Sequence, residues 1–221
     1  MVYRIPAVNL VGRGCLAQLK DEIGTLGCKK ALVVSDKFLT ENGVVEKVTK
    51  VLDQVGIEHT LYNDVKQNPS VANVEGGLEV LKKENCDFIV SIGGGSPQDC
   101  GKAISVLATN GGKITDYEGV NKSQKKCLPI VAIATTAGTS AEVTINYVIT
   151  DEETHIKMIM VDRNTLASIT VNDPELMLSK PAGLTAATGM DALTHAMEAV
   201  VANGAIDVTD ATALYAIKQI F

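Results

Sequence analysis

A repeated alternation of short apolar runs with amphipathic helical stretches constrains the fold more than any other feature of the sequence. The runs 31–34 and 88–92 are dominated by Val, Ile and other apolar residues, which is typical of strands buried on both faces. The stretch 43–56 between them carries apolar residues at helical spacing and ends on a glycine. This alternation predicts an α/β fold with a mainly parallel sheet and helices on both of its faces. We expect strands at 2–10, 31–34, 57–62, 88–92, 129–135, 143–149, 157–161 and 168–171, and helices at 15–24, 43–56, 70–84, 96–109, 184–201 and 208–221.

The character of the sequence changes near residue 180. The stretches 184–201 and 208–221 are Ala-rich and helical, and no strand separates them. We therefore expect an α/β domain over 1–180, followed by the start of an all-helical domain over 181–221. Two helices cannot enclose a core, and the second runs to the apolar Phe221 without a terminating residue. The sequence thus indicates a truncated chain, or a helical pair that packs on something else.

The composition excludes several classes of protein. A net charge of −6 over 221 residues offers no basic surface for nucleic acid. No apolar run reaches the roughly 18 residues that a membrane span needs, and the N-terminus lacks the layout of a secretory signal. The 5 cysteines form no C-x-x-C pair, which favours free thiols in a reducing compartment. We expect a cytoplasmic protein with no nucleic-acid or membrane partner.

Three consecutive glycines, Gly93 to Gly95, follow a predicted buried strand and precede a predicted helix. Glycines let backbone N–H groups approach an anion, and a helix N-terminus adds a partial positive charge, so a pyrophosphate fits here. The structural alternative is a helix cap, with Ser96 as N-cap, Pro97 at the first helical position and Asp99 at the third. Three glycines go beyond what such a cap requires.

A second glycine turn, Gly12 to Ala17, matches the dinucleotide fingerprint G-x-G-x-x-A, and Asp36 follows Gly14 by 22 residues. An acid at that place binds ribose hydroxyls and favours NAD over NADP. The preceding strand, however, carries Pro6 and alternates polar with apolar residues, unlike a buried first strand. A hairpin turn at 12–14 is the favoured interpretation of this segment.

Two further polar segments follow predicted strands. Asn68-Pro69-Ser70 begins a helix, and an ordinary cap explains it. The stretch 135–142 offers several small hydroxyl side chains where an apolar strand ends, which is the edge at which open α/β sheets bind ligands. Small polar residues also simply form turns, and the local sequence does not separate the two interpretations.

Asp191 and His195 lie four residues apart in a predicted helix, which puts a carboxylate and an imidazole on the same face. Such a pair can share a divalent metal ion. The structural alternative is a hydrogen-bonded pair one helical turn apart. Glu198 lies on an adjacent strip of the helix and is better explained as an exposed acid than as a third ligand.

Three of these stretches occur in a characteristic order and spacing, namely 93–99, 135–144 and 187–198. Together they resemble the iron-containing alcohol dehydrogenase family, and the resemblance extends from residue 1 to 221. It implies an N-terminal dinucleotide-binding domain, a C-terminal helical domain and an active site in the cleft between them. It also implies that the 12–17 turn, although it matches the dinucleotide fingerprint, does not bind the coenzyme. The positions implied for NAD are Asp36 at the adenosine ribose, Gly94, Gly95 and Ser96 at the pyrophosphate with Asp99 beside them, Lys157 near the nicotinamide ribose, and Asn68, Thr135, Thr136, Thr139 and Asn146 along the site.

The same resemblance implies that Asp191 and His195 are catalytic and are the first two ligands of an Fe²⁺ ion. The implied reaction is NAD-dependent hydride transfer between a small alcohol or diol, such as 1,2-propanediol, and its aldehyde, with the metal acting as a Lewis acid on the substrate oxygen. The implied assembly is a homodimer. A zinc-using glycerol dehydrogenase is an alternative within enzymes.

The sequence departs from the family pattern at its end. The family completes its metal site with two later histidines, and this chain stops at Phe221 before them. Two ligands are too few for a stable catalytic site, so we expect weak iron binding by this chain alone. The alternative function is a truncated, non-catalytic nucleotide-binding module. We also expect an unpartnered apolar patch at Leu193, Met197, Leu214, Ile217 and Phe221.

Overall fold

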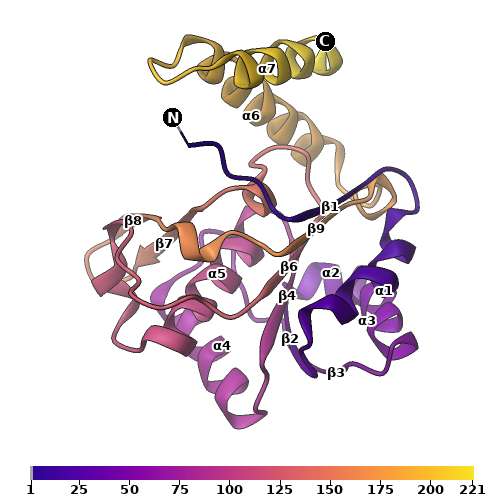
Figure 1. Cartoon of the computed structure of the whole chain (residues 1–221), viewed down its shortest axis with the longest axis vertical. Helices are drawn as coiled ribbons and strands as arrows, with labels where there is room; N and C mark the ends of the chain where they lie inside the picture. Colours follow the sequence, from indigo (N-terminus) through magenta and orange to yellow (C-terminus); the bar gives the residue numbers. More distant parts are fainter. Residues whose placement is uncertain (1) are drawn as a thin grey trace.

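Six parallel strands form the centre of the molecule (Figure 1), in a computed structural model that describes residues 2–221. Each strand is parallel to its neighbours, so the predicted α/β fold with a mainly parallel sheet is confirmed. Across the sheet the order is β1 (Val8–Val11), β9 (Ile169–Asn172), β6 (Ile130–Ala134), β4 (Phe88–Gly93), β2 (Lys30–Val34) and β3 (Glu58–Tyr62).

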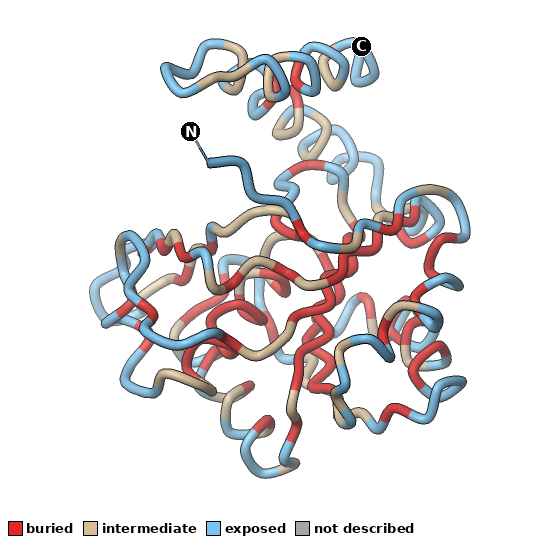
Figure 2. Tube along the Cα trace, viewed as in Figure 1, coloured by how far each residue is buried: buried red, intermediate tan, exposed pale blue. Residues whose placement is uncertain are grey.

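Helices cover both faces of this sheet because both faces are apolar. Successive strand side chains point to opposite faces, so Ala31 and Val33 join one buried cluster while Leu32 and Val34 join another. The first cluster is closed by α1 (Leu19–Glu22) and α3 (Val44–Gln54), and the second by α4 (Val71–Lys83) and α5 (Gly95–Asn110). Figure 2 shows the resulting buried centre in red.

The strand order reverses direction between β2 and β4. From β2 the chain passes through α2 (Lys37–Glu41) and α3 to the edge strand β3, whereas from β4 it continues to β6 on the other side. In open parallel sheets such a reversal leaves a crevice beyond the carboxyl ends of the two strands, where ligands bind. The topology places this reversal point between residues 35–36, after β2, and the glycine turn that follows β4, and we call this region the crevice.

A second, smaller sheet lies beside α5. It contains β5 (Gly119–Val120), β8 (Ile156–Val161) and β7 (Asn146–Asp151), with β7 and β8 forming an antiparallel hairpin. The predicted extended segment 143–149 is therefore wrong at its beginning, because residues 141–143 form a short 3₁₀ turn, η4. Further 3₁₀ turns occur at η3 (Ile114–Tyr117), η5 (Arg163–Thr165) and η6 (Pro174–Leu176).

The first segment of the chain is less regular than predicted. Strand β1 begins only at Val8, since Pro6 has no N–H group to donate to a neighbouring strand. The helix expected at 15–24 is divided into η1 (Cys15–Gln18), α1 and η2 (Ile23–Leu26). Gly27, with φ of 66°, ends the last of these turns in the left-handed conformation.

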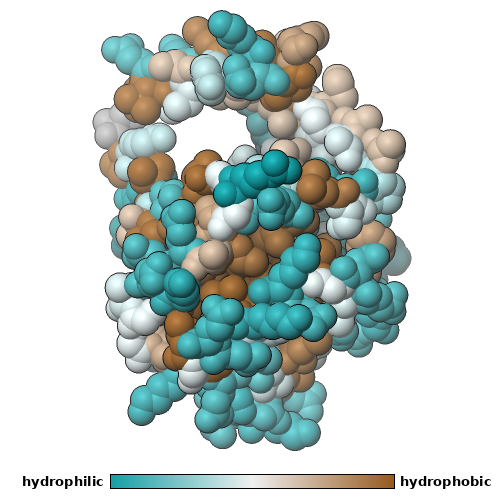
Figure 3. Space-filling model, turned by 90° about the vertical axis from the view of Figure 1, so that its right-hand side faces the viewer, coloured by the Kyte–Doolittle hydropathy of each residue, from teal (hydrophilic) through white to brown (hydrophobic). Residues whose placement is uncertain are grey.

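The chain ends in two helices, α6 (Ala182–Val201) and α7 (Asp207–Ile220), which pack on each other above the sheet (Figure 1). Figure 3 shows an opening between this helical pair and the α/β body. Of the apolar patch expected here, Leu193 is buried, whereas Met197, Leu214 and Phe221 are exposed by 55%, 57% and 94%. No helix within residues 2–221 has both the length and the apolar character needed to cross a bilayer.

Candidate functional site

The glycine turn after β4 leaves the start of helix α5 open. Helix α5 begins at Gly95 with Gly94 as its N-cap, and within residues 2–221 no side chain accepts a hydrogen bond from its first N–H groups. The predicted cap by Ser96, Pro97 and Asp99 is therefore wrong. Gly93 allows α5 to begin at Gly95, one residue before the predicted cap Ser96. A Cβ atom on Gly93 would lie 2.8 Å from Pro97 Cβ, so the Pro97 ring occupies the space that a side chain at residue 93 would need.

The loop after β6 forms the opposite wall of this turn. A Cβ atom on Gly94 would lie 3.0 Å from Thr136 Oγ1, and one on Gly95 would lie 3.3 Å from Thr139 Cγ2. Thr135 is buried, and its N–H group donates to Gly93 O at 3.1 Å. Gly94 and Gly95 thus face the hydroxyl-bearing side chains of Thr136 and Thr139, and an added side chain would fill the space between them. This arrangement is typical of a site where backbone N–H groups bind an anion.

Asp36 stands on the other side of the crevice, at the end of β2. Its Oδ1 atom accepts a hydrogen bond from Leu39 N at 2.8 Å, so it is the N-cap of α2. The neighbouring Ser35 hydroxyl donates to Ile92 O at 2.9 Å and joins the ends of β2 and β4. The cap alone accounts for an aspartate here, and its other carboxylate oxygen makes no hydrogen bond among the described residues.

Asn68 and Lys157 come together from distant parts of the sequence. Lys157 Nζ donates to Asn68 Oδ1 at 2.9 Å, and both residues are exposed. The helix after Asn68 has the ordinary cap that the sequence predicts, with Ser70 as the N-cap of α4. Asn146, the first residue of β7, lines an open cavity of about 340 Å³ together with residues 2–4 and 143–145.

Two residues of α5 hold the segment between β6 and β7 in place. Asp99 Oδ2 accepts a hydrogen bond from Val148 N at 3.1 Å, and burial raises the pKa of this carboxyl to about 6. Lys102 is 1% exposed, and burial lowers the pKa of its ammonium group to about 8. The sequence analysis missed Lys102, although a lysine flanked by Cys100, Ala103 and Ile104 on a buried helix was a detectable signal.

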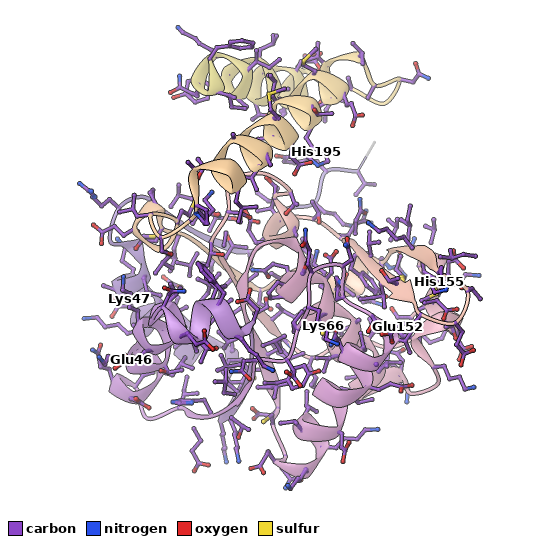
Figure 4. All side chains as sticks on the ribbon, turned by 180° about the vertical axis from the view of Figure 1, so that it is seen from behind. Glu46, Lys47, Lys66, Glu152, His155 and His195 are labelled. Carbon is purple, nitrogen blue, oxygen red and sulfur yellow. The ribbon has the colours of Figure 1, made fainter. Side chains whose placement is uncertain are left out.

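Asp191 and His195 lie one turn apart on the same side of α6. Figure 4 shows His195 on the side of the helix nearer the α/β body. His195 Nε2 lies 3.6 Å from Asp191 Oδ1, which is too long for the hydrogen bond of the structural alternative. Two ligands of one tetrahedral metal ion, each about 2.1 Å from it, lie roughly 3.4 Å apart, so the pair fits a shared ion. Within residues 2–221 no group of three His, Cys, Asp or Glu side chains is arranged to hold a metal.

The loop after β6 reaches α6 at Gly138. A Cβ atom on Gly138 would lie 3.0 Å from Thr188 Cβ and 3.2 Å from Asp191 Oδ2. The Asp191 carboxylate therefore lies against the same loop that carries Thr136 and Thr139. This contact brings the pair on α6 to the edge of the glycine crevice.

The 12–17 turn is filled by a side chain of the protein itself. Gly14 N and Leu16 N both donate to the Asp173 carboxylate at 3.1 Å, and this aspartate is 2% exposed. The hairpin interpretation is wrong, since β1 pairs in parallel with β9 and the turn leads into η1. The N–H groups that a dinucleotide would need are occupied, so this turn is structural.

Family profiles match almost the whole chain. That of the iron-containing alcohol dehydrogenases covers residues 6–174, and that of the C-terminal part of Fe-containing alcohol dehydrogenases covers residues 185–221. The chain belongs to the iron-containing alcohol dehydrogenase family. The resemblance carried by 93–99, 135–144 and 187–198 is thereby confirmed.

Curated members of this family are similar over nearly the full chain. Identity is 52% to alcohol dehydrogenase 4 of Schizosaccharomyces pombe, over 99% of this chain and 52% of the relative. It is 47% to the 1,3-propanediol dehydrogenase of Citrobacter freundii, over 99% and 57%, and 44% to the lactaldehyde reductase of Escherichia coli, over 95% and 55%. The chain spans about half the length of these curated relatives.

Solved structures of iron-containing alcohol dehydrogenases have the same fold. The structure of 1,3-propanediol oxidoreductase superposes with a TM-score of 0.96 at 46% identity, over 99% of this chain and 57% of that one. The sulfoacetaldehyde reductase of Bifidobacterium kashiwanohense, solved in complex with NAD⁺, superposes with a TM-score of 0.91 at 33% identity, over 99% and 58%. The family is iron-containing by description, and one of the structures similar to this chain was solved in complex with NAD⁺.

Proposed function

We propose that this chain carries the coenzyme site and the first two metal ligands of an NAD-dependent, Fe²⁺-assisted dehydrogenase. Its substrates are small alcohols or diols and the corresponding aldehydes, of the 1,2-propanediol and lactaldehyde type. The observation that carries the proposal is the open start of α5, where Gly94 and Gly95 face Thr136 and Thr139 at the reversal point of the sheet.

The coenzyme lies across the crevice in this proposal. The N–H groups of Gly94, Gly95 and Ser96 bind the pyrophosphate, because they have no side-chain partner and lie at the positive end of a helix. Asp36 accepts hydrogen bonds from the adenosine ribose through the carboxylate oxygen that the α2 cap leaves free. The remaining lining residues are Asn68, Asp99, Thr135, Thr136, Thr139, Asn146 and Lys157, with Lys157 near the nicotinamide ribose.

Asp191 and His195 hold the metal in this proposal, supported by their separation of 3.6 Å without a hydrogen bond. A bound Fe²⁺ would supply Lewis-acid activation of the alcohol oxygen, and a bound NAD would supply the hydride acceptor. The chain itself orients the two reactants by joining the loop after β6 to both α5 and α6. Two ligands do not complete a metal site, so the proposal requires further ligands from outside residues 2–221.

The finer organisation follows the same proposal. We divide the chain into a coenzyme domain over 1–180 and a helical metal-binding region over 181–221. A homodimer is expected and can be checked by sedimentation. Five cysteines without a disulfide support a cytoplasmic location.

An NADH titration of two glycine variants tests the coenzyme site. We expect Gly94→Val to weaken NADH binding about tenfold or more, because its side chain would meet Thr136 and fill the anion space. Gly14→Ala alters the competing turn that Asp173 already fills, and because Gly14 has a φ of 76° the folding of this variant is verified by far-UV circular dichroism. Unchanged binding by Gly94→Val, or loss of binding by Gly14→Ala alone, would contradict the assignment.

A second candidate, a nucleotide-binding module without turnover, is favoured by the lack of a third metal ligand near Asp191 and His195 within residues 2–221. Anaerobic assays of NADH oxidation with lactaldehyde and Fe²⁺ separate the two candidates. A dehydrogenase turns over and loses turnover in Asp191→Ala and His195→Ala. A binding module binds NADH and shows no turnover in any variant.

A further inference from the structure

Lys102 is a buried lysine whose ammonium group is fully used inside the protein. It lies on α5 and is 1% exposed. Its Nζ atom donates to Ala141 O at 2.7 Å, to Asn146 O at 2.7 Å and to Thr144 Oγ1 at 3.2 Å. An ammonium group has three N–H donors, so all three have partners. Burying a charge is costly unless the charge is hydrogen-bonded and paired, and these three hydrogen bonds meet part of that cost.

All three acceptors belong to one short segment, residues 141–146, which joins the large sheet to the small one. This segment contains η4 and enters β7 at Asn146. Asp99, one helical turn before Lys102 on α5, accepts a hydrogen bond from Val148 N, just after this segment. Two side chains of α5 therefore bind neighbouring residues of the same stretch of chain. Lys102 and Asp99 together fix residues 141–148 against α5.

The same helix carries the glycine turn of the coenzyme site, and the segment held by Lys102 follows the loop that faces this turn. Helix α5 begins with Gly94 and Gly95, and the segment held by Lys102 continues directly from Thr139. A Cβ atom on Gly95 would lie only 3.3 Å from Thr139 Cγ2. An outward movement of residues 141–146 would therefore increase the distance between Thr139 and the glycine turn. Ala141 N also donates to Thr139 Oγ1 at 3.3 Å, which links the held segment to the wall.

We propose that Lys102 is a positioning residue that sets the distance between Thr139 and the start of α5 at the coenzyme site, by holding residues 141–146 against α5. It does not touch the coenzyme, and it acts through Thr139 and Asn146. The inference rests on the proposed coenzyme site at Gly94 to Ser96.

The charges around Lys102 determine how pH acts on this contact. The carboxylates that influence it are Asp99, on the same helix, and Glu142, in η4. Burial lowers the pKa of Lys102 to about 8, while these two carboxylates oppose the shift. Below that pH the ammonium group donates three hydrogen bonds. As the pH rises through this pKa, the Lys102 ammonium group becomes an amine with two N–H donors. Residues 141–146 are then held less firmly, and the affinity for NADH falls.

The test is an NADH titration of the full chain at pH 7 and pH 9, with far-UV circular dichroism to verify that each variant is folded. Lys102→Met keeps the length of the side chain and removes its donors. We expect it to weaken NADH binding about tenfold at pH 7 and to abolish the difference between the two pH values. Lys20→Met, on the exposed surface of α1, is its control.

Thr144→Val keeps the inference testable if Lys102→Met does not fold. It removes one of three acceptors, at 3.2 Å, and leaves the buried lysine in place. We expect it to weaken NADH binding about two- to fivefold at pH 7. Thr49→Val, on the exposed side of α3, is its control.

The outcomes distinguish this inference from the proposed function. Wild-type affinity that falls from pH 7 to pH 9, with the expected losses in the two variants, supports it. If Gly94→Val loses binding while Lys102→Met, or Thr144→Val in its place, binds as tightly as its control, the inference is overturned and the coenzyme site stands. If the wild-type chain binds no NADH, both are overturned.

Discussion

At the scale of residues, Asp173 decides that the 12–17 turn is structural. Its carboxylate accepts hydrogen bonds from Gly14 N, Leu16 N and Glu175 N. An acidic side chain thus occupies the place that a phosphate group takes in a dinucleotide fingerprint. The turn at Gly93 to Gly95 has no such internal partner, and this difference separates two glycine turns that look alike in the sequence.

Removing that carboxylate should destabilise the fold. We expect Asp173→Ala to lower the free energy of unfolding by about 2 kcal/mol, because three backbone donors lose their acceptor and one of them, Leu16 N, is buried. Urea denaturation followed by circular dichroism measures the change. Asp21→Ala, an exposed acid on α1, should change it by less than about 0.5 kcal/mol. Equal effects of the two variants would contradict the role of Asp173.

Sequence reasoning found the residues whose role is local and missed those whose partners are distant. Gly94 and Gly95 are recognisable because the strand, the turn and the helix are contiguous. Lys102 finds its carbonyl acceptors 39 and 44 residues further along the chain. Asp173 acts on amides 157 and 159 residues away. No local pattern predicts such pairs, because only the completed sheet brings them together.

At the scale of elements, apolar periodicity predicted the long helices and the buried strands well. Helix α3 and strands β2 and β4 lie within two residues of the predicted bounds, since burial on one or both faces fixes their patterns. The short helix α2 and the 3₁₀ turns were not predicted, because three to five residues carry too little periodicity. The small sheet was not foreseen as separate, since its strands look like those of the large one.

A pair of glycine variants tests how α6 rests on the loop after β6. We expect Gly138→Ala to reduce the hydrogen-exchange protection of α6, because the added methyl group would lie 3.0 Å from both Thr188 Cβ and Thr188 O. Gly189→Ala is the control within α6, where nothing lies within 4 Å of the added atom. It should increase protection slightly, since alanine favours the helix by roughly 1 kcal/mol. Increased protection in both variants would show that Gly138 is not a contact point.

At the scale of the whole molecule, the chain has a well-buried body and an exposed helical pair. The six-stranded sheet and the helices that cover it hold both buried clusters, whereas α6 and α7 together bury only Leu193, Ala196 and Ala213 among the described residues (Figure 2). A part with so few buried contacts opens at a lower free energy than the rest.

Limited proteolysis should therefore act on the helical pair first. We expect the earliest cuts between residues 177 and 221, followed by a resistant fragment that contains the six-stranded sheet. Mass spectrometry of the fragments identifies the cuts. Early cleavage within residues 30–134 would contradict this order of stability.

The contact at Gly138 also gives α6 the geometry of a lever. Counted from its first residue, Ala182, the contact residue Thr188 lies about 9 Å along the axis, whereas Val201 lies about 29 Å along it, at ~1.5 Å per residue. When α6 tilts about its first residue, Ala182, a movement of Thr188 by a given distance moves the far end of the helix about three times as far. Asp191 and His195 lie between these two points. The same tilt therefore moves the ligand pair less than it moves α7, and the pair stays closer to its position beside the crevice.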